Sequence, residues 1–496
     1  MKRLSFFYFL LFICFLLFLV RLIELQLIFG GRYRALADGN RIRQLVIPAP
    51  RGLIYDRNDQ PLVANRPLYR LCESEDKCQE ISRDEALKLQ AEGSATAEQI
   101  RLSLFRYYPF GRALAHVLGY LDHDGQPQTG LEKYYHDWLE GQDGGELIEV
   151  DTFGQRVRDL GRREALPGRD LYLSLDANLS KIAFEALAGY RGAIVVTEAK
   201  TGQVLALASS PSFDPNQIEP SLLSDEDKPF FNRALSGAYP PGSIFKIITA
   251  AAGLEEGKIK GQTLYTDEGV IRVGDFVYRN WYFTQYGRTE GAINVVRALT
   301  RSTDTFFYKV GEWLGAEALI GWAEKFSLGN STGIDLPAES TGHLPSLSQK
   351  FYLGNLYHLA IGQGDLLITP LQANLIAVVI ATDGRLCLPK IQSGESTCQD
   401  LDLKKETLDL IKEGMIGACS SGGTAYPLFD FQPRVACKTG TAEYGDKEGK
   451  THAWLVAFAP VDEPQIVVSV LVEGGGEGSS VAAPMAKKIL EAWFRE

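Results

Sequence analysis

The sequence predicts an α+β protein: a mainly antiparallel β-sheet flanked by helices, preceded by a smaller β-rich domain and one N-terminal transmembrane helix. Three features of the 496 residues indicate this. An apolar run at 4–20 has the length of a membrane span. A Pro-Gly linker at 165–168 divides the rest, and after it helical stretches alternate with short strand-like runs. The predicted parts are residues 1–29, 30–168 and 169–496.

The N-terminal segment predicts an uncleaved membrane anchor. After Lys2 and Arg3, the run from Leu4 to Val20 carries no charge. A cleaved signal peptide has a shorter apolar core and a small-residue cleavage site, whereas about 20 apolar residues cross a bilayer. Residues 1–29 are therefore expected to form a short cytoplasmic tail and a signal anchor. Charge alone leaves the orientation open, because Arg21 and further arginines follow the span.

Composition excludes several classes of function. The net charge is −11 and the pI is about 5.3, which argues against a nucleic-acid surface. The hydrophobic fraction of 45% and the charged fraction of 23% are those of an ordinary globular protein. No Cys-x-x-Cys motif occurs, and no histidine lies between His136 and His343. We therefore expect neither a metal site nor a cofactor.

The seven cysteines fit a location outside the cytoplasm. Two pairs that are close in sequence are predicted to form disulfides: Cys72 with Cys78, and Cys387 with Cys398. Cys14 lies in the membrane segment, and Cys419 and Cys437 are left over. We interpret Cys437 as a buried thiol that packs like a small apolar side chain.

The first extracytoplasmic part, residues 30–168, contains strand signals and short helical ones. Apolar runs at 53–55 and 61–64 flank the polar turn 56–60, which predicts a hairpin. The charged, Ala- and Leu-containing stretch 80–105 predicts one or two short helices.

The second part, residues 169–496, supplies the main sheet and its covering helices. The predicted helices are 179–187, 243–256, 294–299, 316–326, 370–381 and 484–494. The predicted strands are 171–173, a hairpin within 192–207, and runs at 434–441, 453–458 and 465–472. Joining the last three runs to the hairpin makes the mainly antiparallel sheet.

The most informative segment is Tyr239-Pro-Pro-Gly-Ser243-Ile-Phe-Lys246. Proline cannot continue a helix backward and glycine leaves room for a substrate, so Ser243 is expected to begin a helix. Positions i and i+3 share a helix face, which brings Lys246 toward the Ser243 hydroxyl. A serine needs a neighbouring base to become a nucleophile, and a buried lysine near a second cation can be that base. The spacing is the Ser-x-x-Lys motif of penicillin-recognising acyl transferases.

Two further motifs follow in the right order: Ser302-Thr303-Asp304, and Lys438-Thr439-Gly440-Thr441 in a strand-like run. Each motif also has a chance copy. Ser74-Glu-Asp-Lys77 lies in a charged stretch with no apolar helix behind it. Ser174-Leu-Asp176 and Ser212-Phe-Asp214 match the middle motif, and Lys200-Thr-Gly202 lies in a predicted hairpin turn.

With these motifs the chain resembles the class B penicillin-binding proteins, most closely the elongation-type members, the penicillin-binding protein 2 family of peptidoglycan D,D-transpeptidases. The resemblance covers nearly the whole chain. Further segments that carry it are Arg51–Asn65, Gly130–Tyr135, Pro211–Asn216, Thr332–Pro337, Ile361-Gly-Gln-Gly364 with Thr369-Pro-Leu-Gln372, and His452-Ala-Trp454. It implies a β-lactamase/transpeptidase-like domain behind a pedestal (dimerisation-type) domain, whose head is shortened here.

The resemblance also implies the site. Ser243 attacks the carbonyl between two D-alanines of a stem peptide, and Lys246 accepts its proton. Ser302 passes a proton to the leaving D-Ala amine, and Asp304 holds both lysines. Asn is usual at this third position in the wider superfamily, whereas Asp is frequent in elongation-type members.

The last motif has the remaining expected roles. Lys438 supplies positive potential that favours a neutral Lys246 and an anionic substrate. The hydroxyls of Thr439 and Thr441 suit the substrate's terminal carboxylate, and Gly440 lets the substrate approach the strand. By resemblance, the backbone N–H groups of Ser243 and Thr441 form the oxyanion hole.

The expected partners are peptidoglycan stem peptides, β-lactam antibiotics, the membrane through the N-terminal helix, a SEDS-type glycosyltransferase and elongation-complex proteins, with no nucleic acid. The expected location is the bacterial inner membrane, as a single-pass protein with its bulk outside the cytoplasm. A D,D-carboxypeptidase side activity is compatible with the same chemistry.

Three alternatives remain open. The chain could be a division-type transpeptidase, a β-lactam sensor that uses the same serine, or a scaffold that activates a glycosyltransferase. A sensor would need a cytoplasmic effector or several spans, but only residues 1–3 precede the single span. A β-lactamase is disfavoured by the anchor, the pedestal and the lack of a Glu-x-x-Leu-Asn motif.

Overall fold

The computed structural model describes residues 2–495 except 75–76, 96–98, 152–155, 348–350 and 446–448. The chain forms two compact units that are interleaved in sequence. The first contains residues 1–53, 65–107 and 137–169, and the second contains 54–64, 108–136 and 170–496. The single predicted boundary at residue 168 stays a prediction. Residues 54–64 and 108–136 belong to the second unit although they precede that boundary.

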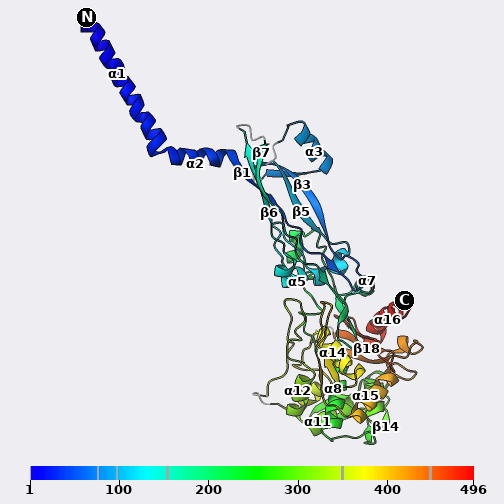
Figure 1. Ribbon diagram of the computed structural model, residues 1–496. Helices are drawn as coiled ribbons and strands as arrows, with labels where there is room; N and C mark the ends of the chain where they lie inside the picture. The colour runs from blue at the N-terminus through cyan, green and yellow to red at the C-terminus, as the bar shows by residue number, and fades with distance from the viewer. Residues whose placement is uncertain are drawn as a thin grey trace. The chain divides into compact units, whose positions relative to one another are not determined.

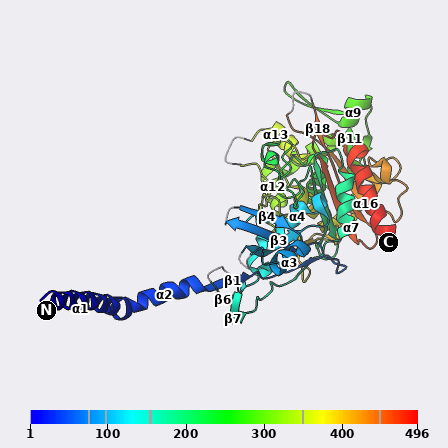
Figure 2. The same cartoon turned by 90° about the horizontal axis from the view of Figure 1, so that it is seen from above.

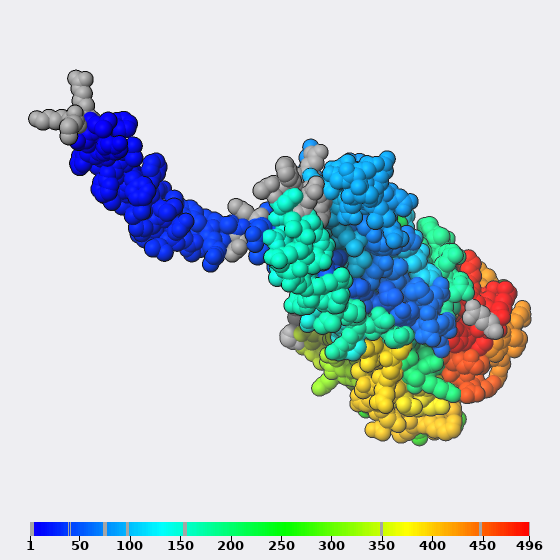
Figure 3. All heavy atoms as spheres, turned by 45° about the horizontal axis from the view of Figure 1, so that its top comes forward, coloured from blue at the N-terminus to red at the C-terminus, as the bar shows by residue number. Residues whose placement is uncertain are grey.

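The chain begins with an exposed apolar helix. Helix α1 (Lys2–Ile23) continues through a π-helical turn, η1 (Glu24–Ile28), and α2 (Gly30–Arg41) follows. The helical segment 4–28 is long and apolar enough to cross a membrane, and its side chains are exposed (Figure 3). Large side chains such as Phe18 (75% exposed) have no protein core to pack against, as expected of a helix whose solvent is lipid.

The first unit contains two three-stranded sheets. One has the order β1-β6-β7 and the other β4-β3-β5. The bounds are β1 Ile42–Ile47, β3 Ala64–Ser74, β4 Lys77–Ile81, β5 Ile100–Tyr107, β6 Gly144–Val150 and β7 Arg156–Arg163. Within the predicted helical stretch 80–105, α3 (Arg83–Ala91) is a helix capped by the Ser82 hydroxyl. Residues 100–105 are wrongly predicted as helix, because they pair with β3 as strand β5.

The second unit is built on one five-stranded antiparallel sheet of order β10-β9-β19-β18-β17. Figure 1 labels its strand β18. Its strands are β9 Gly192–Glu198, β10 Val204–Ser210, β17 Ala436–Glu443, β18 Thr451–Ala459 and β19 Ile466–Val472. The predicted hairpin and the three predicted strand runs all join it. The predicted fold class is therefore confirmed, although β8 (Leu171–Tyr172) pairs instead with β2 (Ile54–Tyr55) in a separate parallel pair.

Helices cover both faces of this sheet. Their bounds are α7 Ala177–Ala186, α8 Lys246–Glu255, α10 Val295–Arg301, α11 Asp304–Leu314, α12 Ala316–Lys325, α13 Leu353–Ala360, α14 Pro370–Ala381, α15 Lys405–Ala418 and α16 Ala483–Arg495. Helices α7 and α16 lie side by side on one face (Figure 2) and contact each other. Side chains alternate along β18, so Leu455 joins the core under α7 and α16, and Val456 joins the core on the opposite face.

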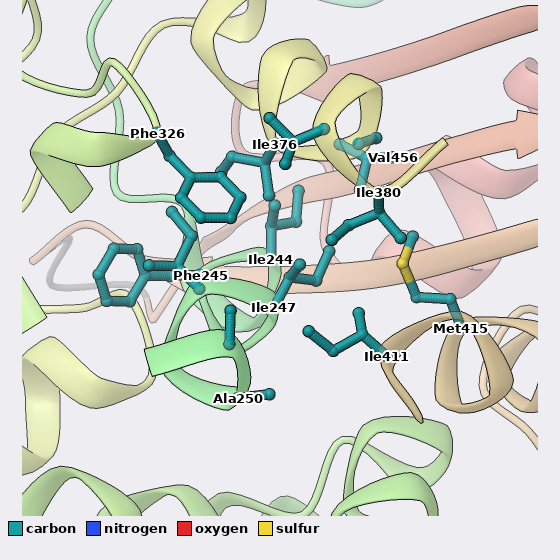
Figure 4. Close-up of a cluster of buried hydrophobic side chains, with 14 of the residues drawn as sticks. Ile244, Phe245, Ile247, Ala250, Phe326, Ile376, Ile380, Ile411, Met415 and Val456 are labelled. Carbon is teal, nitrogen blue, oxygen red and sulfur yellow. The ribbon is translucent and has the colours of Figure 1, made fainter. Parts of the chain in front are cut away.

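The core on that opposite face holds α8 in position (Figure 4). Ile244 and Ile247 pack among Ile376 of α14, Ile411 of α15 and Val456 of β18, all fully buried. Each buried side chain of this size stabilises the fold by about 1.5–3 kcal/mol. The start of α8 is thereby fixed against the sheet.

The smaller elements belong to the second unit, except that residues 137–139 of α6 belong to the first. They are α4 Ala115–Leu118, α5 Gly130–Tyr134, α6 His136–Leu139, α9 Trp281–Tyr286, β11 Tyr265–Asp267, β12 Val270–Val273, β13 Phe276–Arg279, β14 Gly291–Ile293, β15 Arg385–Cys387 and β16 Cys398–Asp400. Single-turn helices occur at η2 Gly111–Ala113, η3 Pro220–Ser224, η4 Gly242–Ile244, η5 Tyr426–Leu428 and η6 Gly478–Ala482. The predicted turn at 56–60 is present, because Tyr55 bridges Pro61 in antiparallel fashion.

Three disulfides occur among the described residues. The two predicted pairs, Cys72–Cys78 and Cys387–Cys398, are confirmed. The interpretation of Cys437 as a free thiol is wrong, because Cys437 of β17 bonds to Cys419 at the end of α15, with Cα atoms 5.8 Å apart. Helix α15 packs on β17, and this packing brings together two cysteines that are 18 residues apart.

Candidate active site

The turn before Ser243 is shaped by Gly242. Its φ is +54°, a left-handed conformation that favours glycine, and a Cβ there would lie 2.8 Å from the Thr441 carbonyl oxygen. The Gly242 N–H donates to the Gly362 carbonyl at 2.8 Å. Ser243 lies half-buried in the single turn η4, and α8 begins only at Lys246. The predicted helix start at Ser243 is therefore a tighter 3-10 turn.

Lys246 points into the interior of the second unit. Its side chain is fully buried, and its Nζ donates to three oxygens: Asp304 Oδ1 at 2.6 Å, the Ser302 carbonyl at 2.8 Å and Ser302 Oγ at 3.2 Å. An ammonium has three N–H donors, so these three acceptors satisfy the protonated form completely.

Ser302 lies between the two lysines. It occupies the break between α10 and α11 in a left-handed conformation, with φ 56° and ψ 40°. A serine in this region is uncommon, and such strain is typical of functional positions. Its Oγ is 3.2 Å from Lys246 Nζ and 2.8 Å from Lys438 Nζ, so one hydroxyl bridges both amines.

Asp304 begins α11 and is held on both sides. Its Oδ1 accepts from Lys246 and its Oδ2 accepts from the Trp281 N–H at 2.9 Å. The Asp304 N–H donates to Asn280 Oδ1 at 3.2 Å. The N-terminal end of a helix favours a negatively charged side chain, so the position of Asp304 at the start of α11 adds to the hydrogen bonds that hold it.

The third motif lies on β17, the edge strand of the sheet. Lys438 is fully buried, and its Nζ donates to the Thr439 carbonyl at 2.9 Å as well as contacting Ser302. The Thr439 hydroxyl is 2.8 Å from the Thr424 hydroxyl, whereas Thr441 is exposed. A Cβ on Gly440 would lie 3.0 Å from Trp454 Cβ and 3.1 Å from the Pro241 carbonyl, so glycine keeps the strand close to the nucleophile turn.

Burial sets the charges of the two lysines. Burial lowers the pKa of Lys246, while the Asp304 carboxylate raises it. Burial lowers the pKa of Lys438 much further, and the nearby Lys246 charge lowers it again. Asp304 pairs with Lys246 at 2.6 Å, and no ion pair joins it to Lys438 among the described residues, so we assign the proton in the free site to Lys246. The predicted role of Lys438 in favouring a neutral Lys246 stays a prediction.

The structure thus brings Ser302, Asp304, Lys246 and Lys438 into hydrogen-bond contact, with Thr439 next to them on β17. The chance copies of the motifs have other surroundings. Ser174 Oγ donates to the Val204 carbonyl at 2.8 Å, and Lys200 pairs on the surface with Glu463. Across the described part of the chain, no group of three or more His, Cys, Asp or Glu side chains could hold a metal ion.

Sequence reasoning missed four residues around the site. Trp281 and Asn280 hold Asp304, Thr424 contacts Thr439, and Gln363 reaches β17. The segment Ile361–Gly364 carried part of the family resemblance. The resemblance therefore indicated that Gln363 matters, but not that it contacts β17.

Two family models match the chain. The family model "Penicillin binding protein transpeptidase domain" matches residues 192–491, and "Penicillin-binding Protein dimerisation domain" matches 72–173. The Escherichia coli protein named peptidoglycan D,D-transpeptidase MrdA is 31% identical, covering 95% of this chain and 90% of its own length.

Two solved structures are also similar. A chain from a peptidoglycan synthase complex that coordinates polymerization and crosslinking is 31% identical with a TM-score of 0.80, covering 99% of this chain and 98% of its own. The Helicobacter pylori penicillin-binding protein PBP2, solved in complex with MreC, is 27% identical with a TM-score of 0.80, covering 91% and 99%.

Proposed function

This chain belongs to the penicillin-binding protein 2 family of class B penicillin-binding proteins, and from that premise we propose that it is a peptidoglycan D,D-transpeptidase that cross-links stem peptides during elongation. The observation that carries the proposal is the buried Lys246–Ser302–Lys438 contact beside the turn of Ser243. A family member without this chemistry would have no reason to bury two lysines around one hydroxyl, because isolated buried charges are costly.

We propose acylation with Ser243 as nucleophile. Ser243 Oγ attacks the carbonyl of the penultimate D-alanine while its proton passes to Lys246, forming a tetrahedral intermediate. The C–N bond to the last D-alanine then breaks, and its nitrogen takes a proton through Ser302. The products are a Ser243 ester and free D-alanine. An amine of a second strand then attacks the ester and gives a proton to Lys246. The C–O bond to Ser243 breaks and Lys246 passes this proton to Ser243 Oγ, which yields the cross-link and the free serine.

The same contacts explain how Lys246 could become a base. In the free site the proton is on Lys246, so it must leave before Lys246 can accept another. A substrate carboxylate next to Lys438 favours a protonated Lys438. Ser302 Oγ touches both amines, so it can donate its proton to Lys438 and accept one from Lys246. Substrate binding would thereby move one positive charge from Lys246 to Lys438.

Strand β17 is the proposed substrate strand. Its free edge faces the turn of Ser243, since the Thr441 carbonyl lies next to Gly242. The backbone N–H groups of Ser243 and Thr441 are the proposed oxyanion hole, typically worth about 3–4 kcal/mol per donor. The hydroxyls of Thr439 and Thr441 are the proposed carboxylate contacts, with Gly440 keeping the strand open to the substrate.

We also propose the cellular setting. Helix α1 anchors a single-pass protein in the inner membrane, with residues 30–168 as pedestal and 169–496 as catalytic domain outside the cytoplasm. One similar structure was solved with MreC and another comes from a peptidoglycan synthase complex. These support elongation-complex proteins and a polymerising glycosyltransferase, which we propose to be of the SEDS type, as partners of this chain. β-Lactams would acylate Ser243, and hydrolysis of the natural ester would appear as a minor D,D-carboxypeptidase activity.

Covalent labelling tests the assignment. The Ser243→Ala variant of the full chain should fold but should not be labelled by a fluorescent penicillin, because the hydroxyl proposed as the nucleophile is absent. Ser74→Ala, which removes the chance Ser-x-x-Lys copy, is the matched control and should label normally. Labelling of Ser243→Ala, or its loss in the control, would refute the site. Rounding of cells after depletion would support elongation, and filamentation would support division.

A further inference from the structure

Strand β17 has a free edge, and its backbone groups alternate between that edge and β18. The Thr439 carbonyl faces the edge, because Lys438 Nζ donates to it at 2.9 Å. The Thr441 carbonyl faces the edge too, next to Gly242. Outward groups recur every second residue, so the next outward position is Glu443, the last residue of β17.

The outward position at Glu443 is already occupied. The side-chain amide of Gln363 pairs with the backbone of Glu443. In the amide orientation that satisfies both groups, its nitrogen donates to the Glu443 carbonyl at 3.2 Å and its oxygen accepts from the Glu443 N–H at 3.2 Å. One primary amide thus makes the two hydrogen bonds that a residue of an added antiparallel strand would make.

Gln363 is fixed by the segment that carries it. Its own N–H donates to the His358 carbonyl at 2.8 Å, at the end of α13. The preceding Gly362 accepts from Gly242 at 2.8 Å and has a φ of +76°; a Cβ there would lie 2.1 Å from the Gly242 carbonyl oxygen. The amide therefore reaches β17 from a segment bonded directly to the nucleophile turn.

We propose that Gln363 ends the substrate strand on β17. A donor peptide, bound along this edge as in the function proposed above, can form ladder hydrogen bonds at Thr439 and Thr441 but not at Glu443. Residues further from the scissile bond must leave the sheet edge there. Gln363 thus determines specificity: the site recognises only the end of the donor peptide and does not pair with a longer extended strand.

Two thioester donors of different length test this with the full chain in detergent. Both carry D-alanyl-thioglycolate, which ends in a carboxylate; one has an N-benzoyl group and the other a tripeptide before the D-alanine. The readout is the ratio of kcat/KM for the long donor to that for the short one. In the unmodified protein the ratio should be near one, because the added residues gain no ladder contact.

Gln363→Met keeps the side-chain length but removes both hydrogen bonds, so the freed Glu443 backbone can pair with the long donor. The ratio should rise about 3- to 10-fold, as expected for one added backbone contact. Gln363→Asn keeps the amide on a shorter stem and should give a smaller rise, which also covers the case in which Gln363→Met does not fold. Asp365→Ala, an exposed neighbour, is the control and should keep the ratio near one.

The outcomes separate the two proposals. An unchanged ratio in folded Gln363 variants that still turn over thioester overturns the role of Gln363 alone. A long donor that is already preferred by the unmodified protein overturns it as well. Loss of penicillin labelling and of thioester turnover in the unmodified protein would overturn both the function and this inference.

Discussion

Replacing Asp304 with asparagine should move the pH dependence of acylation to lower pH. Lys246 Nζ lies 2.6 Å from Asp304 Oδ1 in a buried contact, and the carboxylate is what raises the pKa of Lys246 against the effect of burial. An opposite charge at such a distance shifts a pKa by about 1–3 units. The variant Asp304→Asn should therefore lower the pKa of Lys246 by about that amount.

Two measurable changes follow if Lys246 is the base. Acylation needs neutral Lys246, so the ascending limb of the rate against pH should move down by about 1–3 pH units. The plateau should fall as well, because an amine of lower pKa is a weaker base. Asparagine is usual at this position in the wider superfamily, and its oxygen can still accept from the Trp281 N–H, so the variant is expected to fold.

Stopped-flow measurement of the acylation rate with a chromogenic β-lactam across pH 5–10 gives the position of the ascending limb. Asp409→Asn is the matched control, because Asp409 pairs with Lys405 at 2.7 Å on the exposed surface. It should leave the limb in place. A limb that stays where it is in Asp304→Asn, or moves to higher pH, would refute Lys246 as the base.

The same shift has a consequence for stability. Burial lowers the pKa of Lys246 in the folded protein below its ordinary value of 10.5. The unfolded chain therefore binds more protons between the two pKa values, and the free energy of unfolding rises with pH in that window. Asp304→Asn should extend the window to lower pH. Urea titrations at several pH values measure this, and a variant whose stability is independent of pH there would contradict it.

Three further outcomes are expected. Ser302→Ala should slow acylation by about 100- to 10,000-fold, because it removes the proton relay between the lysines; near-normal stopped-flow rates would remove Ser302 from the mechanism. Loss of the Cys419–Cys437 disulfide by Cys419→Ser should lower the unfolding free energy by about 3 kcal/mol, given the length of the loop that it closes; unchanged denaturant midpoints would contradict this. Thr424→Val removes the 2.8 Å contact with Thr439 and should slow acylation by carboxylate-bearing β-lactams by about 2- to 10-fold. The rate of acylation by a β-lactam analogue without the carboxylate should be the same in the variant and in the unmodified protein.

Local patterns were sufficient for much of the fold. The apolar run at 4–20, the hairpin within 192–207 and the helix 370–381 each follow from residues that are adjacent in sequence, and each is present in the structure. Residues 100–105 were misassigned, because pairing with β3 overrides a weak helical preference. The conformation of such a short segment is decided by the strand or helix that it packs against.

The candidate site divides in the same way. Ser243 and Lys246 could be identified from one segment, because the turn and the helix that carry them are local. The order of the later motifs indicated Ser302 and Lys438, but not that one hydroxyl bridges two lysine amines. That contact requires α8, the α10–α11 break and β17 to converge, which depends on packing across the core.

The sequence by itself determined the anchor, the alternation of strands and helices, and the residue types of the three motifs, because these depend on local periodicity and spacing. The tertiary structure alone decided the Cys419–Cys437 bond, the reach of Gln363 to Glu443 and the pairing of Asp304 with Lys246. Burial and the nearest counter-ion set a lysine's charge, and both are supplied by residues distant in sequence.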